Sequence, residues 1–254
     1  MLLGLGAAAS FLGALGGIGG ATLLVPVLIL LGVAPSEAAP IGLMVVAAGA
    51  LAASGRQLRE GLVHHRIGLV VELAAATGVV AGALVSTSLP DQVLAGVLAA
   101  AAAVGAVAAL ARKGVRNRPV ATFGEEAVLG EWPGTLGGQY RLGDEVVPYQ
   151  ARRVPLGMAL CLAAGVVAGL SGVGGGFLKT PAMSEVMHVP AKVAAATSTF
   201  TLSLTAATGL LVFAGQGRLD TGPGSVAVLG ALVGGLAGAR LESGWRAELV
   251  GEPI

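Results

Sequence analysis

Small residues interrupt an apolar stretch between Gly165 and Pro181, and their types and spacing could serve to bind an anion. Five glycines and one serine fall within residues 169–176, and Lys179 follows closely. Glycine permits the positive φ angles of a helix break and lets a ligand approach the main chain. A half-helix that restarts after the break offers unpaired N–H groups at the positive end of its dipole, which favours anions. The pattern therefore predicts an anion site of backbone amides, with Lys179 as an added point charge.

The same pattern occurs a second time, 155 residues nearer the N-terminus. After one further inserted residue, the correspondence extends to the glycines of a later segment. The matching residues are Gly17-Ile18-Gly19-Gly20 with Gly172-Val173-Gly174-Gly175, Pro26 with Pro181, Pro35 with Pro190, Gly78 with Gly234, and Gly82 with Gly238. Membrane proteins that break their helices at corresponding points of two halves are typically transporters. We therefore expect a duplicated membrane domain with units at about 13–85 and 168–241.

A cluster of hydroxyls, Thr197-Ser198-Thr199, lies early in the apolar segment that follows the second break. These hydroxyls could donate to an anion, or each could bond to the carbonyl four residues earlier in its own helix. The first unit has Ile41-Gly42-Leu43 at the matching place, so a hydroxyl site would be asymmetric. The candidate substrate-binding residues are Gly17, Gly19, Gly20, Thr22, Gly172, Gly174, Gly175, Gly176, Lys179, Thr197, Ser198 and Thr199.

Two ionisable residues inside apolar segments have more than one interpretation. Lys179 would face a cavity as a ligand for the anion, or it would reach an interface or pair with Glu185. Glu72 is a candidate proton carrier, or an interfacial acid close to Arg66.

The composition places the chain in a membrane. Of 254 residues, 55% are hydrophobic and 11% are charged, and the mean hydropathy is +0.84. Soluble domains carry about 25% charged residues. The net charge of +1 gives no basic field, so we expect no nucleic-acid partner. With the single Cys161 and three scattered histidines, we expect no metal and no cofactor. The N-terminal apolar run leads into the first glycine break, so we interpret it as a membrane segment and not a signal peptide.

We predict an all-α integral membrane protein with about seven transmembrane helices in two structural repeats, each opening with a glycine-broken helix. The apolar segments are 2–31, 41–54, 67–84, 93–110, 154–187, 193–214 and 225–241. The expected division is 1–111 as membrane repeat one plus a connector helix, 112–153 as a cytoplasmic loop with a small β-hairpin, 154–243 as membrane repeat two, and 244–254 as a polar tail.

The basic clusters at 56–66, 112–118 and 152–153 are all expected on the cytoplasmic side. If each broken segment crosses the membrane once, the second break enters from the same side as the first, and the repeats are parallel. If each broken segment is a re-entrant hairpin, the number of crossings changes and this deduction fails.

Both units resemble the TauE/SafE family of sulfite exporter-like permeases, also called the TSUP family. The residues that carry the resemblance are the second break with Pro181, Val189-Pro190-x-Lys192-Val-Ala-Ala-Ala-Thr197-Ser198, Gly17-Ile18-Gly19-Gly20 with Pro26, and Gly217-Arg218-Leu219-Asp220. The resemblance implies a carrier in the bacterial inner membrane for small anions such as sulfite, thiosulfate or organosulfonates, coupled to protons. The chain departs from the family in two places. Gly42-Leu43 replaces a Thr-Ser pair, and residues 244–254 are too short and polar for a further helix.

Two other functions match parts of this pattern. Gly169-Leu-Ser171-Gly172 resembles the Gly-x-Ser-Gly of intramembrane serine proteases, but that chemistry needs a histidine on another membrane segment. His64 and His65 lie in a basic loop, and His188 follows the same segment. Half-helices also line channels, so an anion pore is the main alternative. We expect a transporter and not an enzyme, with a small anion, protons and the lipid bilayer as partners. A homodimer is a possible assembly of this chain.

Overall fold

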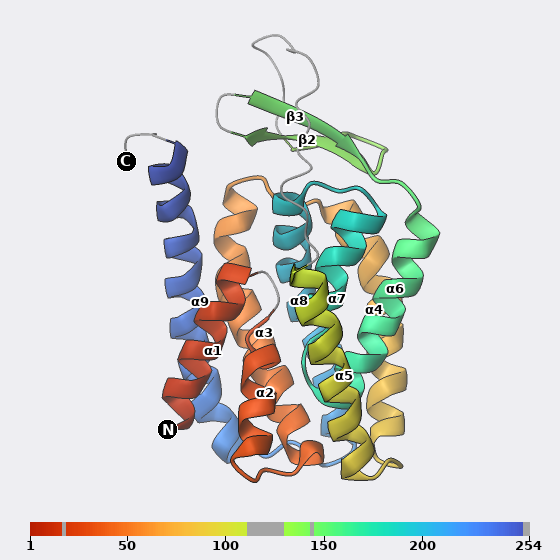
Figure 1. The fold of residues 1–254 in the computed structure, drawn as a ribbon, viewed down its shortest axis with the longest axis vertical. Helices are drawn as coiled ribbons and strands as arrows, with labels where there is room; N and C mark the ends of the chain where they lie inside the picture. The colour runs from red at the N-terminus through yellow and green to blue at the C-terminus, as the bar shows by residue number, and fades with distance from the viewer. Residues whose placement is uncertain (17–18, 111–129, 143–144, 251–254) are drawn as a thin grey trace.

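A bundle of helices with a small sheet across one end makes up the computed structural model, which describes residues 1–16, 19–110, 130–142 and 145–250 (Figure 1). The helices are α1 (Leu2–Gly16), α2 (Ala21–Leu30), α3 (Pro35–Arg59), α4 (His65–Ser86), α5 (Asp91–Leu110), α6 (Val154–Ser171), α7 (Gly176–Pro181), the π-helical turn η1 (Ala182–Val186), α8 (Ala191–Gly215) and α9 (Thr221–Val250). The strands are β1 (Gly130–Glu131), β2 (Gly137–Leu142) and β3 (Glu145–Gln150).

Within the described residues, five helices are long and apolar enough to cross a membrane: α3, α4, α6, α8 and most of α9. Large apolar side chains such as Leu73, Leu211 and Val233 are exposed on these helices. Such a surface suits lipid and not water. The expected all-helical membrane fold is confirmed in this form. α9 continues to Val250, so helix extends into the segment that we expected to be a polar tail from residue 244.

Both glycine breaks reverse the direction of the chain. Gly13 of α1 lies so close to Gly20, at the start of α2, that a Cβ atom on Gly13 would overlap with the Gly20 backbone. In the second broken segment, the Arg152 N–H donates to the Met187 carbonyl at 2.9 Å, which joins the beginning of the segment to its end. Each broken segment is therefore a re-entrant hairpin, formed by α1 and α2 or by α6, α7 and η1.

The two hairpins enter the bundle from opposite ends (Figure 1). The α1–α2 hairpin starts at the end that carries the N-terminus, and the α6–η1 hairpin starts at the end that carries the sheet. The parallel arrangement was deduced only for broken segments that each cross the membrane once, so that deduction fails here and the re-entrant alternative applies. The prediction of about seven transmembrane helices counted each broken segment as one crossing. Because both segments turn back, that count is no longer supported. Hydropathy could not decide between a crossing and a hairpin, because a broken helix has the same hydropathy pattern whether its second half continues or turns back.

Glycines allow two pairs of helices to cross at very short distance, and a Cβ atom on any of these glycines would come too close to a carbonyl of the facing helix. The contacts are Gly78 with Leu162 and Gly82 with Val166 where α4 crosses α6, and Gly234 with Ala7 and Gly238 with Phe11 where α9 crosses α1. The α6 residues follow the α1 residues by 155 positions, and the α9 glycines follow the α4 glycines by 156. The offsets found in the sequence therefore recur in the helix contacts.

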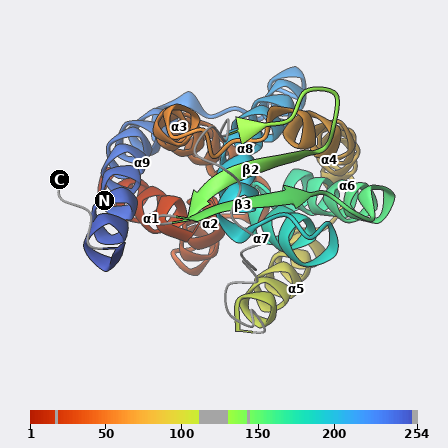
Figure 2. The same cartoon turned by 90° about the horizontal axis from the view of Figure 1, so that it is seen from above.

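The sheet lies across one end of the bundle, with β2 and β3 above the helix ends (Figures 1 and 2). These strands pair antiparallel, with Tyr140 opposite Val147, where the sequence led us to expect a hairpin. Residues 143–144 of its turn lie outside the described residues. Tyr140 and Val147 are buried in one apolar cluster with Ile67 of α4 and Met183 of η1. The sheet is too small for a core of its own, so it shares one with the helices beneath it.

Candidate functional site

A buried ion pair between α7 and α4 is the main polar feature inside the bundle. The Lys179 ammonium nitrogen lies 2.5 Å from Oε2 of Glu72. The Lys179 side chain has no exposed surface, and the Glu72 side chain retains 8%. Each residue comes from the middle of an apolar segment, where an unpaired charge is very costly. The two charges therefore neutralise each other within the bundle.

Two threonines of α8 complete the surroundings of this pair. The Lys179 ammonium donates to the hydroxyl oxygens of Thr205 at 2.5 Å and Thr201 at 3.3 Å. The Thr205 hydroxyl lies 2.8 and 2.9 Å from the two carboxylate oxygens of Glu72, so it can accept from the lysine and donate to the glutamate. We call Glu72, Lys179, Thr201 and Thr205 the ion-pair cluster. A lysine ammonium has three N–H donors, and the three partners in the cluster take up all of them.

The ion-pair cluster decides between the alternatives left open for its two charged residues. Lys179 is fully buried and pairs with Glu72, so it neither extends to an interface nor relies on Glu185. Glu72 does not act as an interfacial acid beside Arg66, whose guanidinium donates to the Trp132 carbonyl at the sheet instead. Sequence reasoning left Glu72, Thr201 and Thr205 out of the candidate substrate-binding residues, although it named Glu72 as a candidate proton carrier. The available signal was one ionisable residue of each sign inside apolar segments, which are expected to pair.

The second break takes its shape from three glycines with positive φ. These are Gly172 at +74°, Gly174 at +82° and Gly175 at +75°. Gly172 caps the end of α6, and Gly176 begins α7. Residues with a side chain are disfavoured at such angles. The chain turns back here because glycine occupies all three positions.

The first break agrees with the second at one glycine and departs from it at the next. Gly19, the counterpart of Gly174, has φ +83°, whereas Gly20 is right-handed at −62°. Gly17 lies outside the described residues. Thr22 follows in the first turn of α2 and is half-buried. The two breaks are therefore related turns with different detailed geometry.

Two apolar side chains lie where the breaks approach each other inside the bundle. A Cβ atom added at Gly174 would lie 2.9 Å from Val46 of α3. One added at Gly19 would lie 3.3 Å from Leu202 of α8 and 3.8 Å from Val46. Leu202 follows Val46 by 156 positions, so corresponding residues of the two halves meet at this point. Both are buried, and together they separate the two breaks.

The three hydroxyls of the Thr197–Thr199 cluster have different surroundings. Thr197 accepts a hydrogen bond from the His64 N–H at 3.0 Å. Thr199 donates to the Ala195 carbonyl of its own helix at 3.0 Å, which is the back-bonding alternative. The Ser198 hydroxyl is buried without a hydrogen-bond partner in the described part of the chain. Of the three, Ser198 is the hydroxyl whose hydrogen-bonding capacity is left for a ligand.

A small cavity lies beside the first break, between the α1–α2 hairpin, α3 and α8. Its volume is about 10 Å³, enough for about one water molecule. Ser10 and Thr199 line it, and the Ser10 hydroxyl is buried without a partner within the described residues. Sequence reasoning did not select Ser10, although it is the one hydroxyl-bearing residue of the apolar helix α1. Thr199 lies on the face of α8 opposite to Thr201 and Thr205. The predicted single site is thus divided between the two faces of α8.

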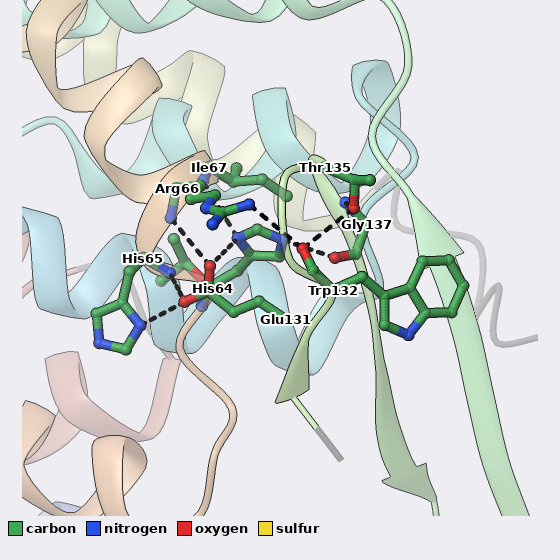
Figure 3. A network of polar contacts seen from close by, with 9 residues as sticks. His64, His65, Arg66, Ile67, Glu131, Trp132, Thr135 and Gly137 are labelled. Atoms are coloured by element: carbon green, nitrogen blue, oxygen red, sulfur yellow. Dashed lines mark hydrogen bonds and ion pairs between the residues drawn. The ribbon is translucent and has the colours of Figure 1, made fainter. Parts of the chain in front are cut away.

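A polar network joins the sheet to the start of α4 (Figure 3). His64 donates through Nε2 to the Gly137 carbonyl at 3.1 Å and accepts through Nδ1 from the Ile67 N–H at 3.2 Å. These two partners suit the neutral ring with its proton on Nε2. Glu131 of β1 accepts from the His65 backbone N–H at 2.9 Å and lies 2.5 Å from its ring nitrogen. The network connects the sheet to Thr197, because the His64 ring bonds to the sheet and the His64 backbone N–H donates to the Thr197 hydroxyl.

The charge states in this network follow from burial and from the hydrogen bonds. Burial lowers the pKa of His64, against the opposing effects of its bond to Gly137 and the nearby charge of Glu131. Burial alone would raise the pKa of Glu131, but the hydrogen bonds from His65 outweigh it and lower that pKa. A neutral His64 and an ionised Glu131 therefore hold the sheet at neutral pH.

A charge pair buried among apolar helices, next to two glycine-broken hairpins, is typical of membrane transporters. The chain belongs to the Sulfite exporter TauE/SafE family, whose model matches residues 2–250. It is 27% identical over 252 residues to a probable membrane transporter protein, YunE, of Bacillus subtilis (strain 168), in a match that covers 95% of this chain and 87% of that protein. No solved structure matches the chain. The expected family is confirmed, and the chain is a multi-pass, sulfite exporter-like membrane transporter.

Proposed function

We propose that the chain is a secondary transporter of small sulfur-containing oxyanions, such as sulfite, thiosulfate or organosulfonates, with protons as the coupling ion. The observation that carries this proposal is the fully buried cation of Lys179 on a half-helix that starts at a glycine break. An ionisable residue at such depth is typically functional, and an ammonium group suits an oxyanion. Neutral donors, the Ser198 hydroxyl and the backbone N–H groups of the breaks, would complete the site.

The two halves of the chain are inverted repeats in this proposal. The recurring offsets of the helix contacts and the entry of the hairpins from opposite ends support this assignment. Helices α3, α4, α5, α8 and α9 would then cross the bilayer, and one hairpin would re-enter from each side. Transporters with inverted repeats expose one central site alternately to either side by rocking their two halves. Val46 and Leu202 would lie at the point about which the halves move.

The end of the bundle that carries the sheet faces the cytoplasm in this proposal, and the membrane is the bacterial inner membrane. Arginines gather at that end, at the close of α3, at the start of α4 and just before α6. They are Arg56, Arg59, Arg66, Arg152 and Arg153. An excess of basic residues marks cytoplasmic loops.

The test is uptake of sulfite and of thiosulfate into proteoliposomes, with and without a pH gradient, for the wild type and for Lys179→Ala. Saturable uptake that the substitution abolishes, with the variant still folded, supports an anion carrier with Lys179 in its site. Uptake that survives the substitution would move the site to the backbone amides. Uptake that rises without saturation would favour an anion pore, and no uptake of any of these anions would remove the substrate assignment.

A further inference from the structure

The ion-pair cluster leaves Lys179 no donor with which to bind a substrate. Its three N–H groups are directed to Glu72, Thr201 and Thr205, and the side chain has no exposed surface. An anion can therefore reach the ammonium only if one of these partners leaves. The two threonines are neutral and can stay beside a bound anion. Glu72 is the partner that occupies the place of an anion.

Two anions beside one buried ammonium would leave a net negative charge in a region of low dielectric constant. Such a charge is costly unless it is neutralised. A proton on Glu72 removes the conflict, and the protonated carboxyl can keep its hydrogen bond with Thr205. Glu72 is also the member of the pair that retains some exposed surface, 8% of its side chain.

We propose that Glu72 is the residue that couples protons to transport, because its carboxylate and the substrate anion compete for Lys179, so the anion binds only when Glu72 is protonated. This inference rests on the proposed function and adds its mechanism of coupling. The empty site holds one positive and one negative charge. The loaded site holds Lys179, a singly charged anion and a neutral Glu72, so it has the same net charge. One proton therefore accompanies each singly charged anion, and the cycle is electroneutral.

The other half of the chain shows that the fold does not need this ion pair. At the offsets of 155 and 156 residues, the four positions of the cluster correspond to Leu24, Val45, Gly49 and Val228. Leu24 fills the place of Lys179 and is almost completely buried. The corresponding helix packing thus contains apolar residues in one half of the chain and the charged pair in the other. Replacing a buried ion pair by apolar residues is often neutral or stabilising, so its presence in one half indicates a role beyond packing.

In the part of the chain that the structure describes, few other titratable groups face Glu72 from the elements around it. α6 contributes the Cys161 thiol, which interacts electrostatically with both charges of the pair, and α7 contributes Lys179. α8 contributes the hydroxyls of Thr201 and Thr205, which stay uncharged. On α4 itself, His65 and Arg66 lie at the sheet end, where they contact Glu131 and Trp132. Cys161 is therefore the residue whose contribution must be separated from that of Glu72.

The experiment compares two modes of sulfite transport in proteoliposomes that contain the full chain. The first is exchange of labelled for unlabelled sulfite at equal pH, which needs no net proton movement. The second is accumulation driven by a gradient of one pH unit, which supports about tenfold accumulation of a singly charged anion when one proton moves with each anion. A potassium diffusion potential tests electroneutrality, because it should leave this accumulation unchanged.

Glu72→Gln should retain exchange and lose the accumulation, so that its ratio falls from about tenfold to about one. The controls Glu185→Gln and Cys161→Ala should accumulate sulfite like the wild type. Accumulation by Glu72→Gln at the wild-type level, or loss of exchange in a folded Glu72→Gln, would overturn the coupling role while leaving the proposed function in place. A wild type without sulfite or thiosulfate exchange would remove the proposed function, and the coupling role with it.

Discussion

Lys179 and Glu72 lie 107 positions apart in the sequence, yet their charged atoms approach to 2.5 Å inside the bundle. The pair connects the second hairpin, through α7, to α4, which belongs to the first half of the chain. A movement of one half against the other would therefore act directly on this contact.

Lys179→Leu is expected to destabilise the protein by about 3–5 kcal/mol, because it leaves Glu72 buried without its cation. The double variant Lys179→Leu with Glu72→Val should recover most of this loss, since Leu24 and Val228 occupy the corresponding places of the other half. Thermal unfolding in detergent measures both effects. A double variant no more stable than the single one would show that the two halves do not pack equivalently.

Gly78→Ala is expected to lower stability by about 1–3 kcal/mol, because its new methyl group would overlap with the Leu162 carbonyl and force α4 and α6 apart. The matched control is Gly55→Ala in α3, where nothing lies within 4 Å of the added carbon. The control should be neutral or slightly stabilising, because alanine is favoured over glycine within a helix. Equal unfolding temperatures for the two variants would contradict the close helix crossing.

Thr197→Val and Ser198→Ala should have opposite consequences although the residues are neighbours. Thr197→Val leaves the buried His64 N–H without its acceptor, which costs about 1–3 kcal/mol. Ser198→Ala removes a hydroxyl that has no partner in the described residues, so stability should be unchanged or raised. If Ser198 contacts the substrate, its variant should bind sulfite more weakly while remaining as stable as the wild type. A large loss of stability in Ser198→Ala would mean that this hydroxyl has a structural partner.

Acidification is expected to weaken the attachment of the sheet through His64. Its pKa in the folded protein lies below the ordinary value of 6.5, because burial disfavours the charged ring. The unfolded or detached state therefore binds more protons just below pH 6.5, so stability rises with pH in that window. The contribution is complete above pH 6.5 and is lost progressively as the pH falls toward the lowered pKa of the folded state.

The fluorescence of Trp132, which lies in this network (Figure 3), can report on the detachment when Trp245 is replaced by Phe. His64→Asn should remove the pH dependence and keep the cap of α4, because asparagine can also accept from the Ile67 N–H. His188→Asn serves as the control, because it makes the same substitution at an exposed histidine outside this network. A transition below pH 6.5 that persists in His64→Asn would assign the titration to another group.

The sequence anticipated the helical membrane fold, both glycine breaks and the strand pair of β2 and β3, because each has a local signal. It left open whether each broken segment crosses the membrane or turns back, since the evidence that decides this is a contact, Gly13 against Gly20, and not a pattern. The partner of Lys179 was missed for a related reason. Nearby Glu185 satisfied the local spacing, whereas Glu72 comes to the lysine through tertiary packing, in which α4 and α7 both contact α8.

The meeting of the two breaks at Val46 and Leu202 has a consequence for the electric field across the bilayer. Each hairpin ends part of the way through the bundle (Figure 1), so Val46 and Leu202 would form a thin partition between any pathways that lead to the two breaks from either side. If water fills the pathways, most of the membrane voltage falls across this partition and not across the full thickness of the lipid. A charge that moves past it is worth about 2.3 kcal/mol per 100 mV. An electroneutral loaded site would be largely insensitive to that voltage.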